Sequence, residues 1–172
     1  MKKLFVLRHA HARGPASAPT DFDRGLDSRG REQAAGIART IRDRGFDFDA
    51  IIASPALRVV ETIAGFSAGA KNSVPTIYDQ RVYNARPEAL LDIIRDAEDT
   101  VRSLLMVGHN PGLQELLMNL AQDDPDGLRV EVASGYPTAA LAELELAIDY
   151  WRDIGPGTGR ILSLIRPGDA DE

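Results

Sequence analysis

Short apolar segments, separated by polar and small residues, recur along the whole chain. The first of them ends abruptly at an arginine and a histidine. Continuous apolar runs of four or five residues are typical of strands that are buried on both faces of a sheet. The predicted strands run over Leu4 to Leu7, Ala50 to Ala53, Ser73 to Tyr78, Ser103 to Val107, Thr138 to Leu146 and Arg160 to Ile165.

Between the strands, apolar residues recur at helical spacing. Leu113, Leu116, Leu117 and Leu120, for example, fall at positions i, i+3, i+4 and i+7, which places them on one face of a helix. The predicted helices run from about Arg29 to Arg44, Pro55 to Phe66, Pro87 to Ala97 and Pro111 to Leu120.

The helix starts carry capping signals. Ser28 and Asn110 are predicted N-caps, because their side chains can accept hydrogen bonds from the free N–H groups of a first turn. Pro55, Pro87 and Pro111 are predicted at the first helical position, where the missing N–H of proline costs nothing. Similar strand-to-helix turns therefore follow the second and the fourth strand.

Strands that alternate with helices indicate an α/β fold. We expect a three-layer sandwich with helices on both faces of a mostly parallel central sheet, and leave the direction of the last two strands open. Segment 123–135 is expected to be a long loop, and 149–153 a turn or short helical piece. No inserted cap domain or linker is indicated, so residues 1–172 are predicted to form a single domain with a frayed tail over 167–172.

Composition restricts the possible functions. The 172 residues are 44% hydrophobic and 27% charged, which is typical of a soluble globular protein. No apolar run is long enough to cross a membrane, and the run before Arg8 is too short for a signal peptide, so we expect a cytoplasmic protein. Cysteine is absent and only three histidines are present, which excludes thiol chemistry and argues against a metal site. The net charge of −6 disfavours nonspecific binding to nucleic acid.

Arginines and histidines stand where the predicted strands end. Arg8 and His9 follow the first strand, Arg58 follows the second, and His109 follows the fourth. Parallel neighbouring strands would bring these ends to one edge of the sheet, where ligands of open α/β sheets bind. Guanidinium groups at such an edge suit a phosphoryl group, because they donate bidentate hydrogen bonds and carry permanent charge. The alternative is that Arg8 only solvates a strand end and that His9 is a core histidine.

These residues belong to a longer ordered set of motifs. The set comprises Arg8-His9, Asp23-Arg24, Ser54-Pro55 with Arg58 and Thr62, Tyr83-Asn84, Gly108-His109-Asn110-Pro111 and Pro137-Thr138 before a strand. In this order the motifs resemble those of the histidine phosphatase superfamily, and within it the small SixA-like phosphohistidine phosphatases. The resemblance extends from Leu4 to Pro167 and implies a phosphoglycerate mutase-like fold without a cap domain. Ala10 replaces a common glycine of the family.

The resemblance implies roles for the candidate catalytic residues. His9 would be the nucleophile and would form a transient phosphohistidine, while Arg8, Arg58 and His109 would bind the phosphoryl oxygens. Neutral imidazole is a competent nucleophile near its ordinary pKa of about 6.5. The expected reaction therefore needs no metal, no cofactor and no large pKa shift.

Further residues are candidates for substrate binding. Arg24 either reaches the pocket from the long loop 12–27 or pairs with a neighbouring aspartate on the surface. Asn110 would contact substrate in addition to capping its helix, and Thr138 either hydrogen-bonds near the phosphate or is a plain strand residue. His11 is expected at the rim of the pocket, where it could steer a substrate rather than catalyse.

The leaving group separates the possible substrates. A phosphate ester needs a proton donor, and the region where the wider superfamily generally places an acid offers Asp79 and Glu88, neither in an obvious donor motif. Glu88 is more simply a first-turn residue favoured by the helix dipole. We therefore expect a phosphohistidine-bearing protein as substrate. The alternatives are a phosphomonoesterase acting on a small phosphorylated metabolite and a phosphate- or protein-binding module without turnover.

Overall fold

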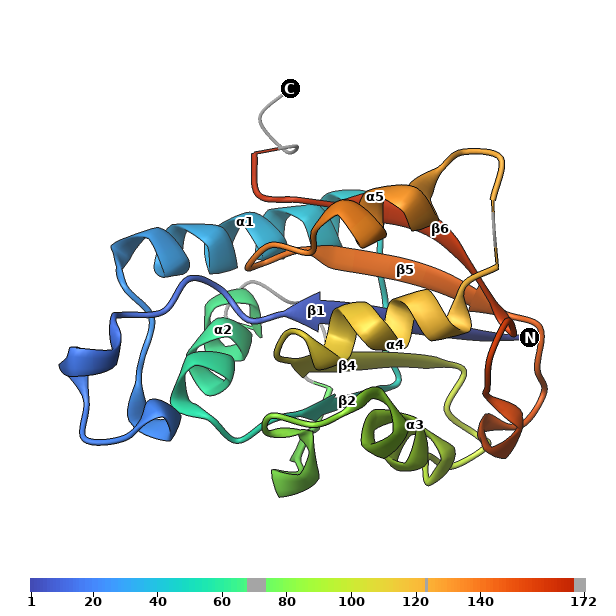
Figure 1. Ribbon diagram of the computed structural model, residues 1–172, viewed down its shortest axis with the longest axis horizontal. Helices are drawn as coiled ribbons and strands as arrows, with labels where there is room; N and C mark the ends of the chain where they lie inside the picture. The colour runs from blue at the N-terminus through green and yellow to red at the C-terminus, as the bar shows by residue number, and fades with distance from the viewer. Residues whose placement is uncertain (68–73, 123, 169–172) are drawn as a thin grey trace.

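The computed structural model describes residues 1–67, 74–122 and 124–168, which form a six-stranded sheet flanked by helices. The strands are β1 (Lys2–Arg8), β2 (Ala50–Ala53), β3 (Thr76–Tyr78), β4 (Ser103–Gly108), β5 (Leu141–Leu146) and β6 (Gly159–Ile165). The α-helices are α1 (Ser28–Arg44), α2 (Leu57–Ser67), α3 (Pro87–Arg95), α4 (Gly112–Leu120) and α5 (Leu128–Ser134) (Figure 1). Short 3-10 helices cover Pro15–Ser17, Asp21–Asp23, Gln80–Val82 and Trp151–Asp153.

The sheet has the order β3-β2-β4-β1-β5-β6. Its first four strands are parallel, since β1 pairs with β4, β4 with β2, and β2 with β3. β5 runs antiparallel to β1, and β6 runs antiparallel to β5. The expected α/β fold with a mostly parallel sheet is confirmed, and the two strands whose direction the sequence left open are antiparallel.

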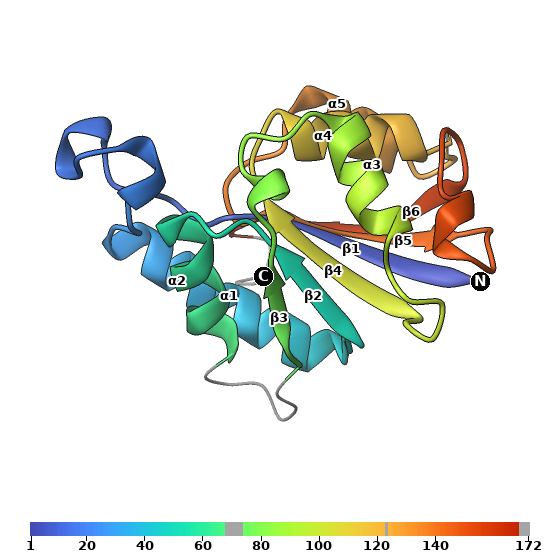
Figure 2. The ribbon, with the colours of Figure 1, turned by 90° about the horizontal axis from the view of Figure 1, so that it is seen from below.

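Alternate side chains of β1 divide the core into two layers. Phe5 and Leu7 pack with residues of α1 and α2, whereas Leu4 and Val6 pack with residues of α3 and α4. Figure 2 shows α1 and α2 on one face of the sheet and α3, α4 and α5 on the other. Because both faces are covered, the central strands are continuous apolar runs rather than alternating ones.

The segment expected to be a long loop contains the helix α5. Gly127, with φ of 74°, precedes the helix, and the Asp124 carboxylate accepts hydrogen bonds from the backbone N–H groups of Leu128 and Arg129. Val132 is fully buried in the core layer that contains α4. The loop prediction was wrong because a helix this short shows little periodicity in sequence, and packing on α4 and β6 stabilises it instead.

The strand expected over Thr138 to Leu146 is extended only from Leu141 onward. Ala139 has φ of 63°, and its backbone N–H donates to the carbonyl oxygens of Arg8 and His9 at 3.1 and 3.0 Å. A tight turn therefore replaces the first part of the predicted strand. This turn binds the segment before β5 to the end of β1, next to both catalytic candidates.

The first turn of α1 is capped by a different residue than predicted. The helix begins at Ser28, and the N-cap is Asp27, whose Oδ1 accepts a hydrogen bond from the Gly30 N–H at 2.8 Å. The prediction that Ser28 is the cap was wrong by one position, since the aspartate before it has an equally suitable acceptor. Asp27 thereby lies at the junction of the long loop and α1.

The proline-led helix starts are partly confirmed. Pro87 begins α3 as expected, whereas α2 begins at Leu57 and α4 at Gly112, after the prolines predicted to start them. Asn110 is not the N-cap of α4, a position that Pro111 takes. The Asn110 side-chain amide instead donates a hydrogen bond to the backbone carbonyl of Tyr136.

Parts of the predictions lie outside the described residues. These parts are Ser73 at the start of the third predicted strand, Asp123 in the expected loop, and 169–172 in the expected frayed tail. In the described ranges no separate cap domain is inserted between the core elements. Single-domain organisation over 1–172 stays a prediction. None of the helices described is both long enough and apolar enough to cross a membrane.

A close backbone contact at the start of α1 generates a stability prediction. A Cβ added at Gly30 would lie 2.0 Å from the carbonyl oxygen of His11, so either the helix or the site-bearing loop would have to move. We expect Gly30→Ala to lower the free energy of unfolding by about 1–3 kcal/mol, the usual cost of overpacking. Urea denaturation followed by circular dichroism measures this loss.

Gly36→Ala in the same helix is the matched control. The nearest atom to an added Cβ at Gly36 is Arg39 Nη2 at 3.7 Å, so alanine fits and should add up to about 1 kcal/mol through helix propensity. Equal stabilities for the two variants would contradict the close contact at Gly30.

Candidate active site

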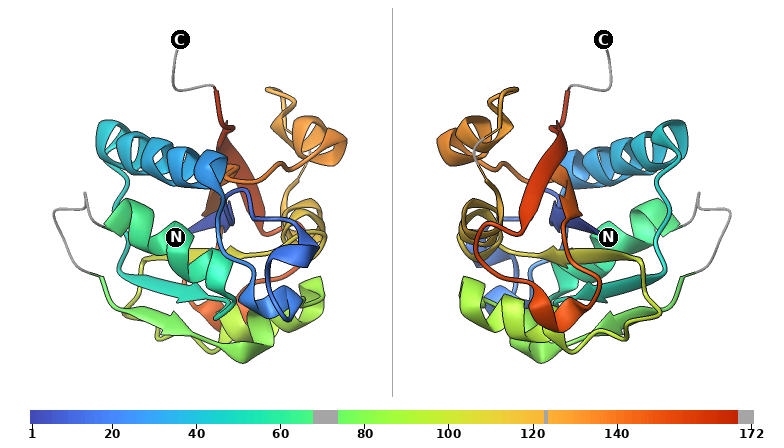
Figure 3. Two further views of the ribbon diagram at one scale, coloured as in Figure 1. Left: turned by 90° about the vertical axis from the view of Figure 1, so that its left-hand side faces the viewer. Right: turned by 90° about the vertical axis from the view of Figure 1, so that its right-hand side faces the viewer.

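The parallel strands bring the predicted residues to one edge of the sheet. Arg8 of β1 lies opposite Gly108 of β4, and the backbone N–H of His9 donates to the Gly108 carbonyl at 3.1 Å. Ser54, after β2, donates its N–H to the Val107 carbonyl at 3.1 Å. The left view of Figure 3 faces this edge, with the blue loop that precedes α1 in front of it.

One pocket of about 280 Å³ lies at this edge. All eight residues predicted for catalysis or substrate binding line it, although they come from separate elements. The lining consists of Arg8, His9, His11, Ala12, Arg24, Arg58, Asn84, His109, Asn110 and Thr138. The described lining includes three arginines and no carboxylate, so the pocket is suited to an anion.

His9 is held in one tautomer. Its side chain is buried, and Nδ1 lies 2.7 Å from the carbonyl oxygen of the next residue, Ala10. Because a carbonyl oxygen only accepts, Nδ1 must carry the proton, and the neutral ring then has its lone pair on Nε2. The Ala10 N–H donates to Thr62 Oγ1 at 3.0 Å and fixes the peptide that orients the ring.

Burial keeps His9 neutral. Loss of solvation is the main cause that lowers the pKa of His9 to about 4. The positive charges of Arg58 and Arg8 act in the same direction, and the hydrogen bond to the Ala10 carbonyl opposes them. Neutral imidazole, the nucleophilic form, therefore predominates from mildly acidic to alkaline pH. The sequence suggested that His9 would need no large pKa shift. Its buried environment nevertheless lowers the pKa, which widens the pH range over which the ring is neutral.

Arg58 is the most buried of the arginines in the pocket, with 3% of its surface exposed. Its Nη1 donates to the Asp21 carbonyl oxygen at 2.7 Å, and its Nη2 donates to Asp21 Oδ2 at 3.0 Å. Nη2 also lies 3.4 Å from Nδ1 of His109. These contacts fix the guanidinium plane at the wall of the pocket.

Arg8 is held by the backbone carbonyl oxygen of Tyr136. Its Nη1 donates to the Tyr136 carbonyl at 2.9 Å, which also accepts from the Asn110 amide at 3.0 Å. The Tyr136 hydroxyl in turn donates to the Val6 carbonyl at 2.6 Å. The Nε atoms of Arg8 and Arg58 are buried without an acceptor, so neither guanidinium has its full set of hydrogen bonds within the protein.

His109 is neutral and bound through both ring nitrogens. Its Nε2 lies 2.8 Å from the Ser54 hydroxyl, and Nδ1 faces Arg58, which can only donate. Nδ1 is therefore the acceptor and Nε2 carries the proton. Burial, followed by the neighbouring His9 and Arg58, lowers the pKa of His109 to about 3.

Asp21 and Tyr83 complete the site and were not predicted as site residues. The Tyr83 hydroxyl donates to Asp21 Oδ2 at 2.6 Å, and the Tyr83 ring lies 5.4 Å from the ring of His109. The Tyr83 hydrogen bond, then that of Arg24, holds the pKa of Asp21 well below its usual range, so Asp21 stays a carboxylate. The Tyr83-Asn84 motif was a signal for this contact, whereas nothing in sequence pairs Asp21 with Arg58.

The predicted substrate-binding residues differ in their contacts. Arg24 lines the pocket and also pairs with Asp21 at 2.8 Å, so both alternatives considered for it occur together. Thr138 and Asn110 line the pocket from the segments that precede β5 and α4. His11 stands at the rim, where its Nδ1 contacts Asp27.

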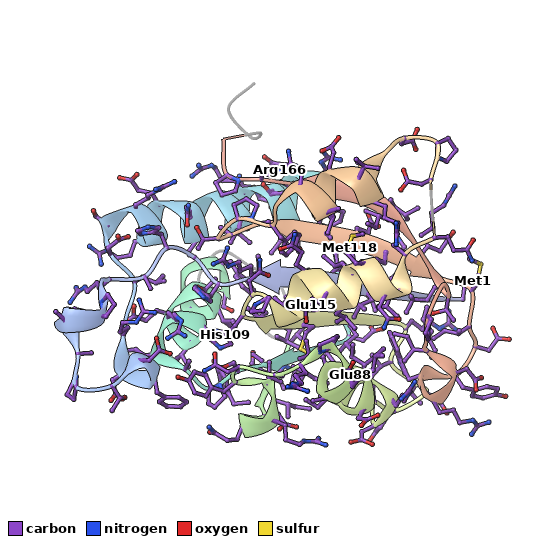
Figure 4. All side chains as sticks on the ribbon, in the orientation of Figure 1. Met1, Glu88, His109, Glu115, Met118 and Arg166 are labelled. Atoms are coloured by element: carbon purple, nitrogen blue, oxygen red, sulfur yellow. The ribbon has the colours of Figure 1, made fainter. Side chains whose placement is uncertain are left out.

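The carboxylates considered as proton donors lie outside the pocket lining. Asp79 forms an ion pair with Arg81 at 2.8 Å, and Glu88 lies in the first turn of α3, as expected. Figure 4 shows Glu88 on α3, apart from His109 at the end of β4. Across the described ranges, no group of three or more histidine, cysteine, aspartate or glutamate side chains could hold a metal ion.

The fold and the site together define a class of protein. A neutral buried imidazole beside fixed guanidinium groups, at the carboxyl edge of a mostly parallel sheet, is an arrangement suited to phosphoryl transfer. The protein is therefore an α/β protein with a phosphatase-type site.

Comparison with known proteins identifies the family. Residues 4–86 match the model of the histidine phosphatase superfamily (branch 1). An uncharacterized protein of Mycobacterium tuberculosis is 30% identical over 163 residues, which cover 94% of this chain and 99% of that one. The chain belongs to the histidine phosphatase superfamily.

Solved structures place the chain near the SixA proteins. A protein from Agrobacterium tumefaciens, named as a candidate phosphohistidine phosphatase SixA, matches with 32% identity and a TM-score of 0.80, over 96% of this chain and 98% of that one. The protein histidine phosphatase SixA in complex with tungstate matches with 18% identity and a TM-score of 0.77, over 96% and 97% of the chains. The first similarity supports a phosphatase, and the second supports the fold.

The environment of His9 generates a pH prediction. Its folded-state pKa of about 4 lies below the value of about 6.5 expected for an unfolded chain, so protonation favours unfolding. Stability from this group is complete above pH about 6.5 and is lost as the pH falls toward 4. A ¹⁵N NMR titration of the histidine rings should show His9 neutral, with the proton on Nδ1, at pH 6. A His9 midpoint at pH 6 or above would contradict the assigned burial.

Proposed function

We propose that this protein removes phosphoryl groups from phosphohistidine on a partner protein, through a phosphohistidine intermediate on His9. The observation that carries the proposal is the pocket lining, which combines a neutral histidine with a free Nε2 and three arginines, and contains no carboxylate among the described residues. This lining can bind and transfer a phosphoryl group but offers no carboxylic acid to protonate an alkoxide.

In the first step, the lone pair of His9 Nε2 attacks phosphorus in line with the leaving group. The phosphorus–nitrogen bond of the substrate breaks, and its electron pair returns to the substrate imidazole. His9 keeps the proton on Nδ1 because the Ala10 carbonyl oxygen accepts it in a hydrogen bond. The phosphorylated ring is therefore cationic, which makes it a good leaving group for the second step.

In the second step, water attacks the phosphoryl group on His9. The bond between phosphorus and Nε2 breaks, its electron pair returns to Nε2, and His9 is restored in its starting tautomer. Inorganic phosphate is the product. No metal takes part in either step of the reaction as we propose it.

Arg8 and Arg58 stabilise the charge on the transferred group. Their guanidinium planes are fixed by carbonyl and carboxylate oxygens before any substrate arrives, so little reorganisation accompanies the reaction. His109 joins them when a dianion approaches, because negative charge favours the protonated ring. Nδ1 of His109 then donates to a phosphoryl oxygen in place of accepting from Arg58.

The leaving group favours an N–P substrate over a phosphate ester. In the free pocket, burial keeps His9 and His109 neutral at neutral pH, and Asp21 is held as a carboxylate. The proton that His109 takes up with a bound dianion is donated to a phosphoryl oxygen, so it is not available to the leaving group. A protonated phosphohistidine leaves as neutral imidazole without an acid. The similarity to proteins named SixA supports the same choice.

A protein substrate is consistent with the shape of the site. A phosphohistidine on a folded partner must reach Nε2 of His9, and no inserted cap domain lies over the sheet edge in the described ranges. Arg24, Asn110 and Thr138 line the pocket and are proposed to contact the substrate, with His11 at the rim.

The covalent intermediate is tested by phosphoryl labelling. Incubation with ³²P-phosphoramidate should give one acid-labile, base-stable phosphoryl group, because the nucleophile is a ring nitrogen. His9→Ala should abolish the label. Asp149→Asn removes an ion pair with the N-terminus, at the end of β1 opposite to Arg8, and should label like the wild type. Undiminished labelling of His9→Ala would exclude His9 as the nucleophile.

The substrate class is tested by direct competition. A carrier protein phosphorylated on histidine and a panel of sugar phosphates are compared in the presence of chelator. We expect kcat/KM to be at least about 100-fold higher for the phosphohistidine protein, because general acid catalysis typically contributes about 10²–10⁴-fold and is missing for esters. Preference for an ester would favour the phosphomonoesterase alternative. Phosphate binding without turnover of any substrate would favour a binding module.

A further inference from the structure

His11 forms a carboxylate–imidazole pair beside His9. Its Nδ1 lies 2.6 Å from Asp27 Oδ2, and the ring lines the same pocket as His9. The side chains of His11 and Asp27 are 40% and 32% exposed, so the pair stands at the border between the pocket and solvent. Water can therefore reach this imidazole, which lines the pocket that holds His9.

The N-cap and the first two turns of α1 fix the backbone of His11. Its backbone N–H donates to Gln33 Oε1 at 2.8 Å, and its carbonyl oxygen accepts from the Asp27 N–H at 3.3 Å. The same oxygen packs so closely on Gly30 that no side chain fits there. The backbone from which the His11 imidazole extends is therefore fixed in place.

The contact with Asp27 selects the tautomer of His11. A carboxylate only accepts hydrogen bonds, so Nδ1 of the neutral ring carries the proton and Nε2 has the lone pair. The Gly30 N–H is the main cause that lowers the pKa of Asp27, and this keeps the carboxyl ionised. In the described part of the chain, no hydrogen-bond partner occupies Nε2 of His11.

The second step of the proposed reaction requires an acceptor for a water proton. His9 carries the phosphoryl group at that stage, and both ring nitrogens of His109 are engaged. The arginines only donate, and no carboxylate is among the described lining residues. His11 is the lining side chain with a free basic nitrogen.

We propose that His11, oriented by Asp27, is the general base that activates water for hydrolysis of the phosphorylated His9. The proposal rests on the function proposed above. As water oxygen bonds to phosphorus, one water proton passes to His11 Nε2, the phosphorus–nitrogen bond breaks, and its electron pair returns to His9. Phosphate leaves as the hydrogen phosphate dianion, and the imidazolium of His11 is balanced by Asp27 until it releases its proton to solvent.

The two steps should depend differently on His11. Attack by His9 on a phosphohistidine releases no proton, so the first step has no need of a base. Rapid-quench measurements with ³²P-phosphoramidate resolve formation of the phosphoenzyme from its decay. We expect His11→Gln to form the intermediate within about threefold of the wild-type rate and to hydrolyse it about 100-fold more slowly, as for loss of a general base.

Asp27→Asn tests the orientation of the ring without removing the helix cap. An asparagine oxygen can still accept from the Gly30 N–H, so α1 keeps its N-cap. Its amide NH₂ then faces His11 Nδ1 and favours the tautomer with the proton on Nε2, which cannot accept from water. Hydrolysis should slow about as much as in His11→Gln. Asp43→Asn, the same charge change at the exposed far end of α1, should behave like the wild type.

A pH profile and chemical rescue separate catalysis from a purely structural effect. The wild-type decay rate should contain one titration that is absent from His11→Gln, and added imidazole should accelerate decay in His11→Ala. The charged and titratable groups that face His11 are Asp27 from the start of α1 and, across the pocket, Arg8, His9, Arg24, Arg58 and His109. Because these groups are common to both proteins, the difference between their profiles reports His11.

The outcomes distinguish the inference from the function on which it rests. If the wild type forms no phosphoenzyme, the proposed function fails. If the phosphoenzyme forms but His11→Gln hydrolyses it within threefold of the wild-type rate, the base assignment is overturned. If formation slows as much as decay, His11 acts in both steps, and its assignment to hydrolysis alone is overturned.

Discussion

Parallel pairing of β1 with β4, and of β4 with β2, is the constraint on which the site depends. It brings three strand ends, which lie far apart in sequence, to one edge of the sheet. The backbone hydrogen bonds that follow each strand then fix where His9 and Ser54 lie relative to β4. Both faces of these strands are packed against helices, so the register is strongly specified and the edge is rigid.

Electrostatics at that edge is a balance between burial and charge. Guanidinium groups stay charged when buried, whereas imidazole rings next to them lose protons, so the site combines permanent cations with neutral histidines. Such a site is suited to a phosphoryl anion and keeps His9, the proposed nucleophile, unprotonated. Asp21 holds Arg58 and Arg24 in place through ion pairs. Its single negative charge does not balance the three arginines of the pocket, so the lining keeps an excess of positive charge.

Sequence patterns predicted the features that depend on local chemistry. The buried strands, most helices and the four pocket residues at strand ends were foreseen because apolar periodicity and residue type carry those signals. The other four pocket residues were foreseen with the help of the family resemblance. Contacts between distant segments were not foreseen, such as Asp21 with Arg58, or Ser54 with His109. The helix α5 and the Asp27 cap were missed because short elements depend on packing and on one-residue shifts that sequence leaves undetermined.

The tautomer of His9, fixed by the Ala10 carbonyl, is proposed to place the transferred phosphoryl group on Nε2. Heteronuclear ³¹P and ¹⁵N NMR of the ¹⁵N-histidine-labelled phosphoenzyme measures this position directly. We expect one phosphorus coupled to Nε2 of His9, with a proton retained on Nδ1. A phosphoryl group on Nδ1 of His9, or on His11 or His109, would contradict it.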